Sequence, residues 1–321
     1  MAEPQVVASL HAPPPGGTAR RRLWQAAIKW PMYSVAVMPA LVAAGSLLGQ
    51  GPGLRWGQLG LFLLAAVLLL AWENLCNDVF DSDTGVDTLG KPHSLVNLTG
   101  RRDRVALAGS LCLLAGLALM ALVAARSDAA VLLLVLACCG IGYLYQGPPF
   151  RLGYRGLGEP LCWLAFGPLA TAAALRALAG PAGLEVQTWG RALQLGSGPA
   201  IATTLVLFCS HFHQVEQDAA HGKRSPVVRL GSARAAGLVP WLVAATLALE
   251  LLPVLAGAWP PSALLALAGL PAATALIALL QTHHGDATRV AGSKFVALRF
   301  QALNGLGLSL GLALGPLLVG R

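Results

Sequence analysis

The sequence predicts an all-α, polytopic membrane protein in which nine transmembrane helices form one bundle. Of the 321 residues, 56% are hydrophobic and only 11% are charged, whereas soluble domains carry about 25% charged residues. Apolar stretches of about 20 residues, the length that crosses a bilayer as a helix, recur along most of the chain. They are rich in Leu, Ala and Gly and lack the period-two alternation of membrane strands, which excludes a β-barrel.

Two regions are expected. Residues 1–22 form a basic N-terminal segment that is predicted to be disordered because it is rich in Pro, Gly and Ala. No apolar h-region precedes Arg20–Arg22, so the first span is expected to be an uncleaved anchor. Residues 23–321 form a single transmembrane domain, whose sixth span has the weakest pattern because Gly196, Gly198 and Pro199 interrupt its start. The nine predicted spans are 29–49, 57–80, 104–124, 129–146, 157–178, 195–213, 234–256, 261–281 and 296–318.

The basic residues predict how these spans are oriented. Seventeen of the 22 Lys and Arg residues lie in the N-terminal segment or in the loops after spans two, four, six and eight, and five lie on the other side. The positive-inside rule therefore places the N-terminus and the even-numbered loops in the cytoplasm. The basic residues form no stripe interleaved with aromatic residues, so no nucleic acid is expected as a partner. The six cysteines lie within or beside apolar runs without CxxC spacing, as packing residues do.

Seven of the fourteen acidic residues lie in two short stretches, at the predicted cytoplasmic ends of spans two and six. Ionisable groups at membrane depth are costly and indicate function. In the first stretch, Glu73, Asn77 and Asp81 are spaced to share one face of a helix. Neighbouring carboxylates repel one another, and hard oxygen donors without His or Cys suit Mg²⁺. The alternative is a solvated acidic loop, because Asp-Ser-Asp-Thr-Gly also favours turns. The other carboxylates of this stretch are Asp78, Asp83 and Asp87.

The second acidic stretch begins at the end of span six. Gln214 and Asp218 are four residues apart and face one way, with Glu216 between them. Carboxylates followed directly by several cations predict a metal that bridges to a multiply charged anion, and a diphosphate is the natural candidate. His211 and His213 serve either as metal ligands or, preferably, as capping or substrate-binding groups. The cations that follow are Lys223, Arg224 and Arg229.

These two motifs carry a resemblance to a known family. Asn77-Asp78-x-x-Asp81 at the end of the second of nine spans, with an acidic motif after the sixth, resembles the UbiA superfamily of intramembrane aromatic prenyltransferases over residues 22–318. Many members carry Asp at the position of Gly85. Here the next Asp is Asp87, and this longer form resembles the branch that prenylates 1,4-dihydroxy-2-naphthoate. Residues 91–100 and 142–151 and the Gly222-Lys223 segment resemble its phytyl-transferring type. Gln214 is a departure, because other members carry Asp there.

The resemblance implies a Mg²⁺-dependent transfer of a phytyl group from phytyl diphosphate to 1,4-dihydroxy-2-naphthoate, with loss of carbon dioxide. The active site would face the cytoplasmic side of a bacterial plasma or thylakoid membrane, with the lipid bilayer around the spans. Tyr145, at the end of span four, would touch the diphosphate or the allylic cation, or be an ordinary interfacial tyrosine. The implied Mg²⁺ ligands are Asn77, Asp78, Asp81, Asp87, Glu216 and Asp218, of which Glu216 would replace the carboxylate missing at Gln214. The implied substrate-binding residues are Lys91, Arg151, Gln214, Lys223 and Arg224.

Other functions remain open at this point. A secondary transporter would carry charges near the bilayer midplane and show an inverted repeat, but only Glu250 lies deep in a predicted span. A Mg²⁺ channel would need a ring of acidic residues along a pore. Among the enzymes, homogentisate or 4-hydroxybenzoate are alternative acceptors, and the longer first motif disfavours both.

Overall fold

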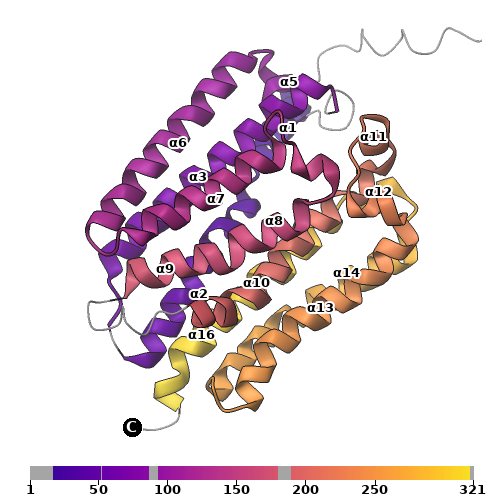
Figure 1. The fold of residues 1–321 in the computed structure, drawn as a ribbon. Helices are drawn as coiled ribbons and strands as arrows, with labels where there is room; N and C mark the ends of the chain where they lie inside the picture. The colour runs from indigo at the N-terminus through magenta and orange to yellow at the C-terminus, as the bar shows by residue number, and fades with distance from the viewer. Residues whose placement is uncertain (1–16, 52, 87–92, 180–188, 319–321) are drawn as a thin grey trace, which may run out of the picture.

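In a computed structural model, which describes residues 17–51, 53–86, 93–179 and 189–318, the chain is a bundle of long helices (Figure 1). The described residues contain no β-strand and a single isolated bridge, between Leu54 and Ala179. The predicted all-α architecture is therefore confirmed. The first helix begins at Gly17, inside the N-terminal segment expected to be disordered, and residues 1–16 lie outside the described part.

Eight segments of the described chain are long and apolar enough to cross a membrane. The predicted span 129–146 corresponds to a ninth helix, Ala130–Gln146, which is apolar but shorter. Seventeen residues are at the lower end of the length that crosses a bilayer. The eight segments are Arg21–Gln50, Trp56–Thr84, Arg102–Ala125, Gly158–Leu178, Trp189–Ala220, Ser232–Leu255, Pro261–His283 and Ala287–Gly315.

The helices and short 3₁₀ or π segments (η) follow in this order: α1 (Gly17–Ile28), η2 (Trp30–Tyr33), α2 (Ser34–Gln50), α3 (Trp56–Thr84), α5 (Leu95–Thr99), α6 (Arg102–Ala125), α7 (Ala130–Gln146), η3 (Leu152–Arg155), α8 (Gly158–Leu164), η4 (Ala165–Leu169), α9 (Ala170–Leu178), α10 (Trp189–Ser210), η6 (Phe212–Gln214), α11 (Val215–Ala220), α12 (Pro226–Leu230), α13 (Ser232–Leu255), η7 (Pro261–Gly269), α14 (Leu270–His283), α15 (Ala287–Val290) and α16 (Ser293–Leu318).

The fifth predicted span is broken rather than straight. It consists of α8, the π-helical turn η4 and α9, and Gly167 inside η4 has non-helical φ and ψ angles. Pro168 follows and cannot donate a backbone hydrogen bond, which accounts for the kink. A side chain on Gly196 of α10 would come within 2.9 Å of the Gly167 carbonyl oxygen. The glycine that weakened the sixth span in the sequence is therefore needed where α10 crosses this kink.

Closely packed small residues hold the centre of the bundle. Gly45 and Gly49 of α2, one turn apart, leave no room for a side chain against the backbone of α16. Gly307 and Gly311 of α16 do the same against the backbone of η7, at Leu265 and Ser262 respectively. Small residues spaced four apart let membrane helices approach closely. These contacts fix the frame that supports the polar end of the molecule.

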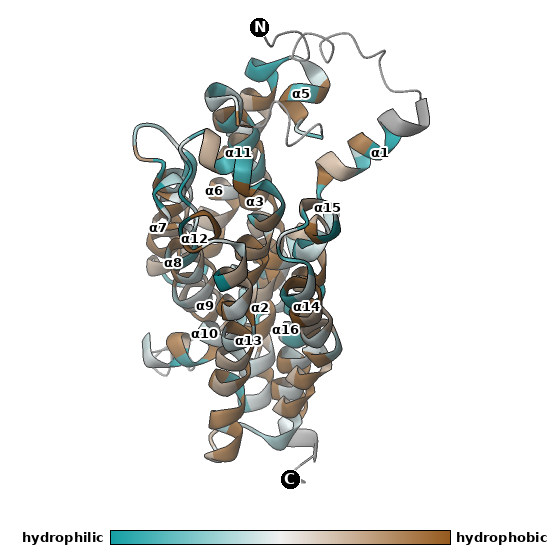
Figure 2. Cartoon of the chain, turned by 90° about the vertical axis from the view of Figure 1, so that its right-hand side faces the viewer, coloured by the Kyte–Doolittle hydropathy of each residue, from teal (hydrophilic) through white to brown (hydrophobic). Residues whose placement is uncertain are grey.

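Polar residues gather at one end of the bundle. Figure 2 shows hydrophilic segments around α5, α11 and α15, and hydrophobic segments along the long helices. Figure 1 shows α1, α5, α11 and α12 at this same end. We call it the motif end, defined by the last turns of α3 together with α5, η3, α11 and α12. Both acidic motifs lie there.

Candidate active site

The first acidic motif occupies the last turns of α3, which continues to Thr84, four residues beyond the predicted end of the span. The three residues predicted to share a face do so, because each contacts the segment formed by α7 and η3. The contacts are those of Glu73 with Gly142, Asn77 with Gln146 and Asp81 with Tyr154. The face of α3 that carries Glu73, Asn77 and Asp81 is therefore directed toward the interior of the bundle.

Asp81 and Asp83 point in opposite directions. Asp81 is buried, and the Tyr154 hydroxyl lies 2.9 Å from its Oδ1 atom as a hydrogen-bond donor. Asp83 is exposed, and Arg102 of α6 donates two hydrogen bonds to its carboxylate, at 2.7 and 2.8 Å. Residues two apart on a helix lie on nearly opposite sides. Only Asp81 therefore contributes to the inner face.

Asp78 is the most buried of the described carboxylates of the first motif, with 2% of its surface exposed. Its Oδ1 atom accepts a hydrogen bond from the ammonium of Lys29, at 3.3 Å. Its Oδ2 atom accepts one from the backbone N–H of Leu95, at 2.9 Å. Asp78 thereby joins α3 to the start of α5 and to the junction between α1 and η2.

The second motif presents one buried carboxylate, Asp218, which is 1% exposed. His211 Nδ1 lies 3.3 Å from Oδ2 and Lys223 Nζ lies 3.3 Å from Oδ1 of this residue. Gln214, four residues before Asp218, is also buried, whereas Glu216 is exposed. The structure thus brings Gln214 and Asp218 to the inner side and leaves Glu216 on the outer side, as the helical spacing requires.

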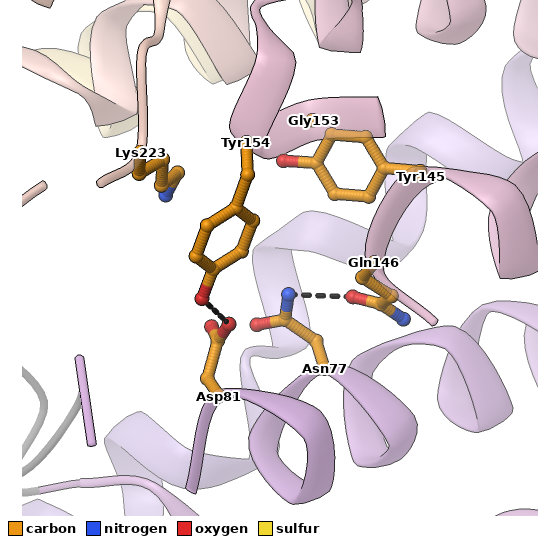
Figure 3. Close-up of a pocket in the computed structure, with 7 residues that line it drawn as sticks. All are labelled: Asn77, Asp81, Tyr145, Gln146, Gly153, Tyr154 and Lys223. Atoms are coloured by element: carbon orange, nitrogen blue, oxygen red, sulfur yellow. Dashed lines mark hydrogen bonds between the residues drawn. The ribbon is translucent and has the colours of Figure 1, made fainter. Parts of the chain in front are cut away.

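Tyr154 lies between the two motifs. Its hydroxyl contacts Asp81 of the first, while Lys223, the ion-pair partner of Asp218, lies 5.8 Å from its ring centroid. The guanidinium of Arg151 lies 5.9 Å from the same ring. Both cations are within the range of a cation–π contact. Figure 3 shows Tyr154 in the pocket at this position, which is lined by Asn77, Asp81, Tyr145, Gln146, Gly153, Tyr154 and Lys223.

The pocket is nearly closed. Its volume is about 10 Å³, which is room for one water molecule. A diphosphate therefore enters only when neighbouring side chains move. Tyr154 and Lys223 are the pocket residues whose side chains contact the two buried carboxylates, Asp81 and Asp218 respectively. The Nε atom of Arg151, beside Tyr154, is buried without a hydrogen-bond partner. An unsatisfied guanidinium donor is suited to an anion.

Tyr145 is held by two glycines. A side chain on Gly153 would come within 2.5 Å of the Tyr145 Cε2 atom, and one on Gly158 within 2.8 Å. Because both positions are glycine, the Tyr145 ring can lie against η3 and the start of α8. Figure 3 shows the ring beside Gly153. Its place in the pocket lining follows from this packing.

Comparison with known proteins identifies the family. The model of the UbiA prenyltransferase family matches residues 36–304. The chain belongs to the UbiA prenyltransferase family. It is therefore a prenyltransferase and an integral, multi-pass membrane protein, which decides against the transporter and channel alternatives.

Two relatives of this UbiA family chain match over most of their length. The 2-carboxy-1,4-naphthoquinone phytyltransferase of Synechocystis sp. is 43% identical over 91% of this chain and 94% of its own. The chloroplastic enzyme of the same name from Arabidopsis thaliana is 41% identical over 92% of this chain and 78% of its own. A solved structure of a UbiA homologue from Archaeoglobus fulgidus bound to DMAPP and Mg²⁺ shares the fold, with a TM-score of 0.51 and 18% identity over 88% of this chain and 97% of that one.

The donors at the motif end fit Mg²⁺. No group of three or more His, Cys, Asp or Glu side chains is arranged to hold a metal within the described ranges. A site made of three or more protein ligands is not needed for Mg²⁺, because this ion keeps several waters and is bound by one or two carboxylates together with substrate phosphates. Asp81 and Asp218 are buried carboxylates on separate motifs, and the amide oxygen of Asn77 adds a third hard donor to the pocket.

Some predicted residues do not join this cluster. Asp87 and Lys91 lie outside the described residues. Arg224 is exposed, and its backbone N–H, rather than its side chain, contacts the carbonyl oxygen of Tyr154 at 2.7 Å. Glu216 is exposed as well.

Sequence reasoning also missed members of the site. Tyr154 is part of neither acidic motif, and its position beside Asp81 depends on the path of the chain through η3. Lys29 is 49 residues from its partner Asp78. Glu159 of α8, whose Oε1 atom lies 3.6 Å from His211 Nε2, had one available signal, an acidic residue at the start of a span in a chain with few charges.

Proposed function

We propose that this chain transfers a phytyl group from phytyl diphosphate to 1,4-dihydroxy-2-naphthoate with loss of carbon dioxide, a step in vitamin K biosynthesis, with Mg²⁺ as cofactor. The observation that carries the proposal is the meeting of two acidic motifs at one pocket, where Tyr154 contacts Asp81 directly and Asp218 through Lys223. The names of the two relatives that match over nine-tenths of the chain support the choice of substrates.

The residues that would hold Mg²⁺ are Asn77, Asp78 and Asp81 with Asp218, and Asp87 and Glu216 stay as further candidates. When bound, Mg²⁺ neutralises the diphosphate and stabilises the leaving pyrophosphate. Lys223 lines the pocket and Arg151 lies beside Tyr154, and both would supply positive charge to the phosphate oxygens. Lys91, Arg224 and Gln214 are the remaining candidates for substrate contacts.

Prenyl transfer then follows from the properties of the pocket. The allylic C–O bond of phytyl diphosphate breaks, so the bonding electrons leave with pyrophosphate and a carbocation remains. The rings of Tyr145 and Tyr154 line the pocket, and aromatic faces stabilise a nearby cation. The lining of this pocket is polar, so the apolar faces of the spans would hold the phytyl tail and exclude water, which would otherwise capture the cation. The naphthoate ring carbon that bears the carboxylate attacks the cation, and the C–C bond to the carboxylate breaks, returning its electrons to the ring as carbon dioxide leaves.

The test uses purified full-length protein in lipid vesicles. Phytyl, geranylgeranyl and solanesyl diphosphates compete for 1,4-dihydroxy-2-naphthoate, and mass spectrometry identifies the products while released pyrophosphate and carbon dioxide are measured. We expect a phytylated, decarboxylated naphthoquinol that forms only with Mg²⁺. Homogentisate and 4-hydroxybenzoate are the control acceptors. Prenylation of either control acceptor without reaction of the naphthoate would contradict the proposal, and preference for another diphosphate would correct the tail alone.

A further inference from the structure

In each acidic motif, one of the buried carboxylates is paired with a lysine. In the second motif the pair is Lys223 with Asp218, and in the first it is Lys29 with Asp78. The nitrogen–oxygen distance is 3.3 Å in both pairs. The aspartates are 1–2% exposed, and the lysine side chains are 12% and 19% exposed. The two motifs thus share a buried aspartate–lysine pair. Only the pair of the second motif is visible in the sequence, because Lys223 follows Asp218 closely whereas Lys29 is 49 residues from Asp78.

Lys29 reaches Asp78 from a part of the chain that is separate from the motif. It lies between α1 and η2, and its φ angle of +53° is in the left-handed region that residues with a side chain rarely adopt. Asp78 is the partner that the structure gives to its ammonium. Because a buried carboxylate without a counter-ion is strongly unfavourable, the Lys29 ammonium neutralises Asp78 in the metal-free protein.

A divalent cation at the first motif changes this balance. Asp78 and Asp81 are one helical turn apart on α3, so a cation bound by Asp81 lies close to Asp78 and supplies the positive charge that Lys29 otherwise provides. Two cations at one carboxylate repel each other. The Lys29 ammonium is carried on a flexible four-carbon stem, so it can move from Asp78 to an anion that arrives with the metal.

We propose, on the basis of the function proposed above, that Lys29 is an exchangeable counter-ion of the first motif: it neutralises Asp78 in the metal-free enzyme and pairs with the diphosphate once a divalent cation has taken Asp78. Lys29 then has two opposite effects. It competes with the metal when no diphosphate is present, and it strengthens diphosphate binding when the metal is present. A residue that only fastens α1 to the bundle would show neither pattern.

The experiment measures the two effects separately on the full-length protein in detergent. Mn²⁺, which takes the same hard oxygen ligands as Mg²⁺, is titrated without diphosphate and followed by electron paramagnetic resonance. Inorganic pyrophosphate is then titrated at saturating Mg²⁺ by calorimetry. For Lys29→Met we expect about three- to tenfold tighter Mn²⁺ binding and about three- to tenfold weaker pyrophosphate binding, the size of effect typical of a partly buried ion pair.

Three further variants make the result specific. Lys29→Arg keeps the charge and should retain both wild-type affinities within about twofold. Arg22→Met removes one charge from the exposed surface of α1 and should leave both affinities unchanged, since exposed charges are screened. Lys29→Gly removes the charge and suits the positive φ angle, so it should reproduce Lys29→Met if the latter fails to fold.

The proposal that Lys29 is an exchangeable counter-ion requires tighter Mn²⁺ binding together with weaker pyrophosphate binding, and any other result overturns it. Weaker Mn²⁺ and weaker pyrophosphate binding together, with a lowered melting temperature, would assign Lys29 to the attachment of α1. Unchanged affinities, with wild-type protein that binds Mn²⁺ and transfers the prenyl group, would overturn the role of Lys29 and leave the proposed function standing. Wild-type protein that takes up no Mn²⁺ would overturn both.

Discussion

At the scale of single residues, the direction in which each carboxylate points separates catalytic candidates from surface charges. Asp81 lies inside the pocket and Asp83 outside it, paired with Arg102. We expect Asp81→Ala to lower prenyl transfer by at least about 100-fold, because the variant loses the proposed metal ligand and the hydrogen-bond partner of Tyr154. Asp83→Ala should change the rate by less than about threefold, because exposed ion pairs contribute little. Product formation at limiting Mg²⁺ measures both, with size-exclusion chromatography as the check on folding.

The exposure of Glu216 makes the second motif testable in the same way. Asp218→Asn should raise the Mg²⁺ concentration needed for half-maximal activity about tenfold or more, because it neutralises the one buried carboxylate of that motif. Glu216→Gln should leave this requirement within about twofold, and Gln214→Ala is the matched control on the buried side. A large rise for Glu216→Gln and a small one for Gln214→Ala would instead assign the missing carboxylate of the motif to Glu216.

The sequence predicts one kind of residue in this site better than another. Glu73, Asn77 and Asp81 were predictable because a single helix places them, and its period of 3.6 residues decides which of them share a face. Lys29 and Tyr154 were not, because their positions relative to α3 depend on how other helices pack. No local pattern records a contact between residues 49 or 73 positions apart.

At the scale of elements, the corner between α7 and α8 determines where Tyr145 lies. Gly153→Ala places a methyl group against the Tyr145 ring, so the ring or η3 must move. We expect at least about tenfold slower prenyl transfer with the protein still folded, since Tyr145 and Tyr154 both line the pocket. Activity is compared with that of Gly140→Ala, a control on α7 where a side chain meets open space. Equal activity of the two variants would show that the ring position is unimportant.

The boundaries of the elements show why apolar pattern alone is insufficient. The second span was expected to end at residue 80, where hydropathy falls, but α3 continues to Thr84 because its polar last turn is held by Tyr154, Lys29 and Leu95. The fifth span was expected to be continuous, and Gly167 with Pro168 breaks it. Tertiary contacts extend one helix past its apolar stretch, and backbone chemistry interrupts another within it.

At the scale of the whole molecule, the bundle brings two motifs together that are more than 100 residues apart in the sequence. The close helix crossings at Gly45, Gly49, Gly307 and Gly311 build a rigid frame, while the motif end is composed of short segments. A rigid apolar frame with a polar, locally held end suits a reaction in which the pocket must open for a diphosphate and then exclude water.

The orientation of this frame in the membrane is the remaining prediction. With seventeen of 22 basic residues on one side, the positive-inside rule places the motif end in the cytoplasm, which is also the side to which a charged diphosphate is restricted unless it is transported. Thr99 is the last residue of α5, at the motif end, and Ala256 directly follows α13 at the opposite end. Both residues are exposed. In a cysteine-free background, Thr99→Cys should react with a membrane-impermeant maleimide only in inverted vesicles, and Ala256→Cys only in intact cells. The reverse labelling would place the active site on the outer side, where a charge bias of this size does not direct it.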